Sequence, residues 1–104
     1  MNKYERVVEG LKSGRVSMKV FGNSMLPIIE SGSELTFAKT DDYQVGDVCL
    51  SKVKGRWIDA HKITKIGSDG RFMIANNRGH ENGWTAQVFA RVVAVNGVPF
   101  GRQS

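Results

Sequence analysis

The stretch VFGNSMLPIIESGSE, residues 20–34, joins the two parts of the chain that show regular patterns, and its composition sets where the fold turns. Its glycines and Pro27 indicate a turn region and not a continuous strand. Just before it, RVSMKVFG alternates polar and apolar residues, the apolar ones being Val16, Met18 and Val20. This period is typical of a half-buried strand. We therefore expect a strand that ends near Gly22, with Ser24 just beyond its end.

A single helix is predicted upstream of that strand. The segment NKYERVVEGLKSG carries apolar residues at helical spacing before Gly14, namely Tyr4, Val7, Val8 and Leu11. We expect the helix to occupy residues 1–14 and to end near Ser13.

Downstream of Pro27 the chain shows β-type patterns only. Five segments have strand composition or alternation and are separated by Gly, Asp and Asn: SELTFAK, DVCLSKV, RWIDAHKITKI, RFMIANN and ARVVAV. Hairpin turns are predicted at residues 54–56 and at residues 68–70, the second of which contains an Asp-Gly pair. The expected fold class is therefore mainly β, a small antiparallel β fold with one N-terminal helix.

One domain should contain the whole chain, because 104 residues with 40% hydrophobic content are too few for two cores. We expect domain boundaries at 1–104, with the β part at residues 16–98. No apolar stretch is long enough to span a membrane, and the N-terminus lacks the pattern of a signal peptide. The single cysteine, Cys49, fits a reducing compartment. These features favour a cytoplasmic protein with no membrane partner.

Charge and metal-ligand content argue against two further classes of function, a zinc protein and a nucleic-acid binder, the second of which stays open as a weaker third class suggested only by charge. The net charge of +5 comes from 15 basic residues that are scattered along the chain, which is typical of a solvated surface and argues against a nucleic-acid partner. Two histidines and one isolated cysteine do not form a zinc pattern. No metal and no cofactor are expected.

Four short motifs occur in the order of a known family. GNSMLP at residues 22–27 resembles the Gly-x-Ser-Met-x-Pro motif of the LexA-like and signal-peptidase-like serine peptidases. YQVGDVCLSKV at 43–53 resembles the Val-Gly-Asp strand of that family, and AHKITKI at 60–66 resembles its His-Arg-Ile/Val box. IANNRGHENGW at 74–84, followed by VFARVVAV, is similar to its Gly-Asp-Asn box and closing strand, especially in phage and bacterial members. The resemblance implies the LexA C-terminal or signal-peptidase type of β fold.

The resemblance also implies a catalytic pair. Ser24 matches the nucleophile of the family, and His61, 37 residues later, matches the general base of its histidine-containing branch. A serine hydroxyl needs an adjacent base to accept its proton. Imidazole, with an unperturbed pKa of roughly 6.5, is mostly neutral at physiological pH and can accept that proton.

Three lysines are alternative bases. Simple strand alternation would put Trp57, Asp59 and His61 on one face of their strand and Ile58, Ala60 and Lys62 on the other. Lys62 would then point away from Ser24 and would be a weak candidate. Lys52 and Lys54, on the preceding strand and turn, stay open as alternatives.

Backbone groups should complete the site. Gly22 stands two residues before the serine and has no hydroxyl, so the oxyanion would be bound by backbone groups of Ser24, Met25 and Gly22. Gly22 also permits a tight backbone conformation, and Met25 and Pro27 would shape the turn. The resemblance implies that an extended peptide binds along the strand that carries Met18, Val20 and Phe21, by addition to a sheet edge.

The Gly-Asp-Asn box of the family is Ala75-Asn76-Asn77 in this chain, so the aspartate that would orient His61 is replaced. Asn76 or Asn77 could hold one tautomer of the imidazole, although an amide cannot stabilise imidazolium as a carboxylate does. Asp59, two residues before His61, is a substitute acid.

Two functions follow from these residues. The first is a serine endopeptidase with a Ser24/His61 dyad that cleaves an extended peptide supplied in trans. The second is a catalytically silent peptide- or protein-binding module that uses the same groove. Such a module could be encoded by a phage. A peptide or protein partner is expected in both, and the sequence is compatible with a homodimer.

Overall fold

The computed structural model describes residues 1–103 and contains one short helix and eight strands. The helix α1, Lys3–Gly10, continues as a 3₁₀ turn, η1, Leu11–Ser13. The strands are β1 Val16–Lys19, β2 Glu34–Ala38, β3 Val48–Val53, β4 Arg56–Ile66, β5 Phe72–Ala75, β6 Glu81–Thr85, β7 Gln87–Val95 and β8 Val98–Pro99. The predicted fold class, mainly antiparallel β with one N-terminal helix, is confirmed.

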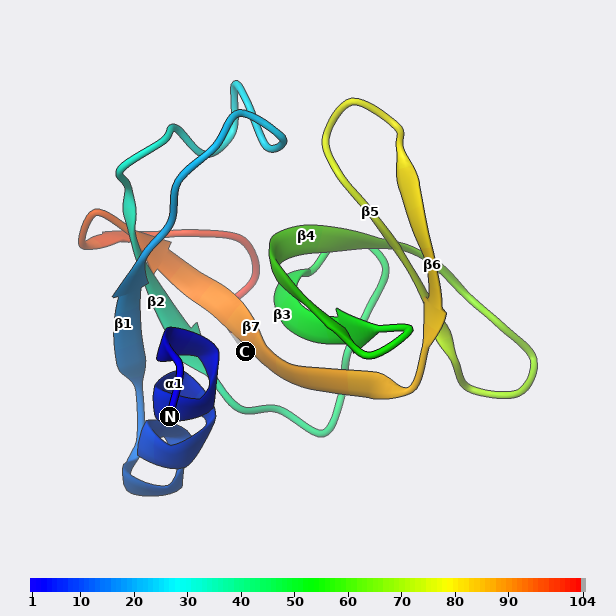
Figure 1. Ribbon diagram of the computed structural model, residues 1–104, viewed down its shortest axis with the longest axis horizontal. Coiled ribbons are helices and arrows are strands. Elements are labelled where there is room, and N and C mark those ends of the chain that lie inside the picture. Colours follow the sequence, from blue (N-terminus) through cyan, green and yellow to red (C-terminus); the bar gives the residue numbers. More distant parts are fainter. Residues whose placement is uncertain (104) are drawn as a thin grey trace.

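The helix begins where its side chains can cap it. The Asn2 side chain accepts a hydrogen bond from the Glu5 amide, and the Glu5 carboxylate accepts one from the Asn2 amide, each at 2.9 Å. This reciprocal pair satisfies two donors that a helix start otherwise leaves free. Val7 and Leu11 are buried beneath the helix, as their spacing predicts. In Figure 1, α1 lies beside β1 and β2.

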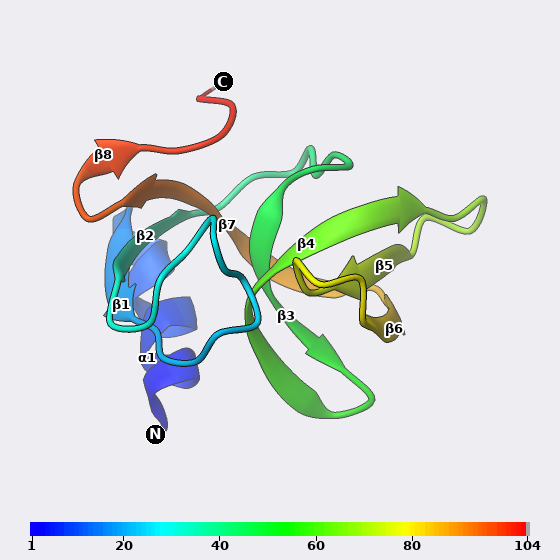
Figure 2. The same cartoon turned by 90° about the horizontal axis from the view of Figure 1, so that it is seen from above.

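All eight strands belong to one strongly curved antiparallel sheet, in which the order is β1-β2-β7-β3-β4-β5-β6 and β8 pairs with β7. Figures 1 and 2 show the long β7 running between the half that carries α1 and the half that carries the β5–β6 hairpin. In this order β1 forms one edge of the sheet, because it pairs with β2 alone. The edge matters because Ser24 follows β1 in the chain.

Two apolar clusters form the core, and β3 contributes to both. Val48 and Leu50 belong to the larger cluster, together with residues of α1, β1, β2 and β7. Cys49 and Val53 belong to the smaller cluster, with Ile63 and Ile74. Truncating a fully buried residue such as Leu50 to Ala would cost about 2–5 kcal/mol. Because alternate residues of β3 are buried on both sides, this strand fixes how the two halves meet.

Both predicted hairpin turns are present. Lys54 and Gly55 connect β3 to β4 with φ values of 52° and 78°, the left-handed pair that a two-residue turn of type I′ requires. Residues 67–71 connect β4 to β5, and Gly70 has a φ of 85°. The Asp-Gly pair thus lies where positive φ is needed.

A bulge interrupts β4 and changes which residues share a face. Cys49 pairs with His61 and Ser51 pairs with Ile58, so β4 has one more residue than β3 between these pairs. Ala60, at the bulge, has a φ of 34°. Simple alternation along β4 was therefore the wrong expectation, because an extra residue reverses the side on which every later side chain lies.

Candidate functional site

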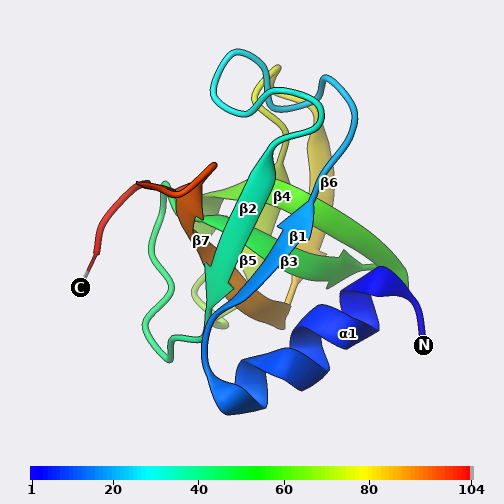
Figure 3. The ribbon, with the colours of Figure 1, turned by 90° about the vertical axis from the view of Figure 1, so that its left-hand side faces the viewer.

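Ser24 lies in the loop between β1 and β2, at the end of the molecule opposite α1 and close to the β5–β6 connection (Figure 3). Met25 and Ile29 anchor this loop, since their side chains are only 4% and 3% exposed and belong to the larger core cluster. The Ile29 amide donates to the Met25 carbonyl at 3.0 Å. Buried apolar residues therefore hold the loop, while Ser24 between them is half-buried.

A shallow cleft brings Ser24 next to the β4 bulge. The cleft has a volume of about 20 Å³ and contains Gly22, Ser24 and Met25 on the loop side and Asp59 and Ala60 on the β4 side. Figure 2 shows the loop passing beside the middle of β4. The bulge thus faces the serine directly, although the sequence separates them by more than thirty residues.

Asn77 fastens the same loop from the other side. Its backbone amide donates to the Ser24 carbonyl at 2.9 Å, and its side-chain Nδ2 donates to the Leu26 carbonyl at 2.8 Å. Its Oδ1 in turn accepts a hydrogen bond from Lys62 Nζ at 3.0 Å. We name Lys62, Asn77 and the two carbonyls of Ser24 and Leu26 the loop clamp.

The loop clamp corrects the expected direction of Lys62. Because the bulge shifts the register, Lys62 lies on the same side of β4 as Trp57, and its ammonium group reaches the residue that holds Ser24. It does not point away from the serine loop. Of the other two lysines, Lys52 places its ammonium group 4.8 Å from the centroid of the Trp57 ring, and Lys54 lies exposed in the β3–β4 turn.

His61 is buried, with 9% of its surface exposed, and pairs with Cys49 of β3. Its Nδ1 is hydrogen-bonded to the backbone carbonyl of Asp59, which can only accept. Nδ1 must therefore carry the proton, and Nε2 is left with the lone pair. Within residues 1–103, no hydrogen bond joins His61 to Ser24.

The residues that were expected to orient His61 have other partners. Asn76 Oδ1 accepts hydrogen bonds from the Arg78 and His80 amides, both at 2.9 Å, and so closes the β5–β6 turn. The Asn77 side chain belongs to the loop clamp. Asp59 contacts the imidazole only through its backbone carbonyl. Burial raises the pKa of the Tyr4 hydroxyl, and the Asp59 carboxylate beside it raises that pKa further. The group that orients His61 is thus a backbone carbonyl, which no side-chain pattern in the sequence indicates.

The backbone amides near Ser24 differ in whether they already donate a hydrogen bond. The Gly22 amide, on a residue with a φ of 111°, donates to Ser31 Oγ at 3.1 Å and is therefore engaged. Among the residues that the structure describes, no backbone hydrogen bond is formed by the amides of Ser24 and Met25. These two amides are the donors that an oxyanion at this cleft would find free.

A peptide bound beside the strand that precedes Ser24 could contact the backbone of that strand but not its buried core side chains. Met18 and Val20 are 8% and 5% exposed, whereas Phe21 is 68% exposed. Val20 continues the pairing with the segment before β2, donating to the Ser33 carbonyl at 3.0 Å. An added peptide strand would therefore meet the backbone of β1 and the side chain of Phe21.

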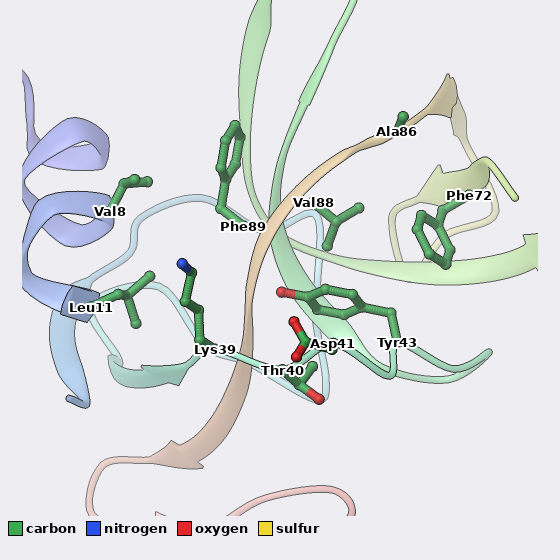
Figure 4. A pocket seen from close by; sticks show the side chains of 10 residues that line it. All are labelled: Val8, Leu11, Lys39, Thr40, Asp41, Tyr43, Phe72, Ala86, Val88 and Phe89. Atoms are coloured by element: carbon green, nitrogen blue, oxygen red, sulfur yellow. The ribbon is translucent and has the colours of Figure 1, made fainter.

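Larger hollows lie elsewhere on the molecule. One of about 430 Å³ is bounded by Val8 of α1 and Leu11 of η1, by Tyr43, and by β7 at Val88 and Phe89 (Figure 4). It shares no residue with the Ser24 cleft. In the described part of the chain, no group of three or more His, Cys, Asp or Glu residues is arranged to hold a metal ion.

Comparison of the chain with protein-family models gives no match, and comparison with curated proteins gives none either. Neither of the helical segments in residues 1–103 has the length and apolar character needed to cross a bilayer.

Proposed function

We propose that the chain is a serine peptidase-like domain in which Ser24 is the nucleophile and His61 the general base, acting on an extended peptide bound in trans. The observation that carries the proposal is the bond between His61 Nδ1 and the Asp59 carbonyl. It selects the tautomer in which Nε2 can accept a proton, which is the task that the aspartate performs in a triad. The missing box aspartate is thereby replaced in its orienting role.

The proposed reaction uses groups at the cleft. A peptide adds to the open edge of β1, and Ser24 Oγ attacks the scissile carbonyl carbon while His61 Nε2 accepts the hydroxyl proton. The amides of Ser24 and Met25 donate to the oxyanion. His61 returns the proton to the leaving amine, and water then hydrolyses the acyl-Ser24 ester. The β3 pairing places His61, opposite Cys49, on the other side of β4 from Trp57 and Lys62, and His61 does not line the Ser24 cleft. The mechanism therefore requires His61 Nε2 to come within hydrogen-bonding distance of Ser24 Oγ when substrate binds.

Acyl-enzyme formation tests this proposal. The full chain is incubated with a library of extended peptides, and cleavage and covalent adducts are followed by mass spectrometry. Ser24→Ala and His61→Ala should each abolish cleavage, whereas Lys62→Met should retain a measurable part of it, because Lys62 acts on loop position. Cleavage that survives in Ser24→Ala overturns the proposal. Loss in Lys62→Met together with full activity in His61→Ala assigns the base to the lysine and overturns the dyad.

A second function, a peptide-binding module without turnover, is favoured by two observations. In residues 1–103 Ser24 and His61 share no hydrogen bond, and the cleft at Ser24 is only about 20 Å³ in volume. A silent module would bind a peptide along β1 equally well before and after Ser24→Ala. Saturable binding with no cleavage by the parent chain would select this function over the first.

A further inference from the structure

The hollow of about 430 Å³ between the helical segment and the start of β7 has an apolar lining that a ligand could cover (Figure 4). Val8 of α1, Tyr43, and Val88 and Phe89 of β7 line it, and each of them is only half-buried. These side chains therefore still expose apolar surface at the hollow. The volume falls within the range of about 300–1,000 Å³ that is typical of small-molecule sites. The hollow has room for a small molecule with an apolar body.

Two opposite charges lie at this hollow, on the segment that leaves β2. Lys39 and Asp41 both line the hollow and are both exposed. Figure 4 shows the ammonium group of Lys39 between Leu11 and Phe89, on the helix side of β7. The carboxylate of Asp41 lies next to the Tyr43 side chain, on the other side of that strand in the same view. The hollow thus presents one positive and one negative group to the same molecule.

Neither of these charges is paired within the described part of the chain. Although Lys39 and Asp41 are only two residues apart, the ion pairs of residues 1–103 include neither of them, so they do not pair with each other. A ligand that carries one charge of each sign could pair with both. Because exposed ion pairs contribute little, most of its affinity would come from covering the apolar lining.

We propose that this hollow binds a free α-amino acid with an apolar side chain. Its carboxylate accepts a hydrogen bond from Lys39 Nζ, its ammonium group donates to the Asp41 carboxylate, and its side chain lies against Val88 and Phe89. An acid without the amine would place its negative charge near Asp41 with nothing to offset it, and an amine without the acid would do the same at Lys39. The hollow shares no residue with the Ser24 cleft, so this proposal is independent of the proposed peptidase function.

Three probes that share a phenyl ring test the charge pattern. Phenylalanine carries both charges, 3-phenylpropanoate lacks the amine, and phenethylamine lacks the carboxylate. Each is added to the full chain at neutral pH and constant ionic strength, and the methyl resonances of Val8, Leu11 and Val88 are followed by carbon-13 NMR. Phenylalanine should shift these resonances saturably at millimolar concentration, about threefold more tightly than either of the other two probes. A non-saturable response to phenylalanine, or equal or tighter binding of a probe with one charge, overturns the proposal.

Two variants assign each charge of the ligand to its residue. Lys39→Gln should weaken phenylalanine and 3-phenylpropanoate about threefold without weakening phenethylamine, and Asp41→Asn should weaken phenylalanine and phenethylamine without weakening 3-phenylpropanoate. Both residues are exposed, so neither change should disturb the fold. Lys19→Gln is the matched control, because Lys19 is exposed on β1 and lines no part of the hollow. Equal weakening by Lys19→Gln and Lys39→Gln, or the same response of all three probes to both hollow variants, overturns the site.

Discussion

The side chain of Asn77 donates a 2.8 Å hydrogen bond to the carbonyl oxygen of Leu26 and so joins the β5–β6 turn to the loop that carries Ser24. The Asn77 amide binds the Ser24 carbonyl, and Lys62 binds the Asn77 side chain. A polar connection between distant segments thus holds Ser24 opposite the β4 bulge. The clamp thus adds polar contacts to the apolar anchors Met25 and Ile29 in holding the loop.

Asn77→Ala should destabilise the protein by about 1–3 kcal/mol, because the half-buried Leu26 carbonyl and Lys62 ammonium both lose their partner. Urea denaturation measures the change in the free energy of unfolding. Asn23→Ala is the matched control, since Asn23 is exposed in the same loop and should change stability by less than about 0.5 kcal/mol. Equal effects of the two changes would contradict a clamping role for Asn77.

Asp47→Ala should destabilise the fold by about 2–4 kcal/mol, because it removes a buried acceptor from Arg102 and from the Gln44 amide. Asp69→Ala removes an acid from an exposed pair with Arg71, in which both side chains are more than 60% exposed, and should cost less than about 1 kcal/mol. Thermal unfolding of both variants compares them. A larger loss for Asp69→Ala would contradict this ranking.

Stability should fall at high pH. Burial, with a smaller effect of the Asp47 charge, raises the pKa of the Cys49 thiol from 9.0 to about 12. The thiol ionises more readily in the unfolded chain, so its contribution is complete below pH 9.0 and is lost as the pH rises toward about 12. Burial also raises the pKa of Tyr43, which acts in the same direction. Calorimetry across this range should show a weaker pH dependence in Cys49→Ala, and an unchanged slope would count against the assignment.

Lys54→Asn should stabilise the protein by about 0.5–1 kcal/mol. Lys54 has a φ of 52° in the turn between β3 and β4, and it precedes Gly55. Asparagine tolerates this left-handed conformation better than lysine, and Asn-Gly is the preferred pair for the turn. The midpoint of urea unfolding measures the effect, with Lys12→Asn on the exposed surface as the control. A destabilised Lys54→Asn would show that the lysine has a role that its conformation does not explain.

The helix, six of the eight strands and the fold class could be predicted from the sequence, because these depend on local chemistry, whereas β6 and β8 were not predicted. Apolar spacing through Val7 and Leu11 predicted the helix, alternation through Val16 and Met18 predicted β1, and glycine-containing turns predicted the hairpins. Each of these signals arises within a few residues, where side-chain periodicity and backbone preference act directly.

The assembly of the site depends on the folded chain and could not be predicted from local sequence patterns. The bulge at Ala60 comes from the pairing of β4 with β3, so alternation along β4 alone predicted the wrong side for Lys62. The clamp by Asn77 and the bond from His61 to the Asp59 carbonyl involve backbone atoms, which every residue carries and which no motif reveals. Backbone groups find partners according to where the whole sheet places them, and that placement is a property of the folded chain.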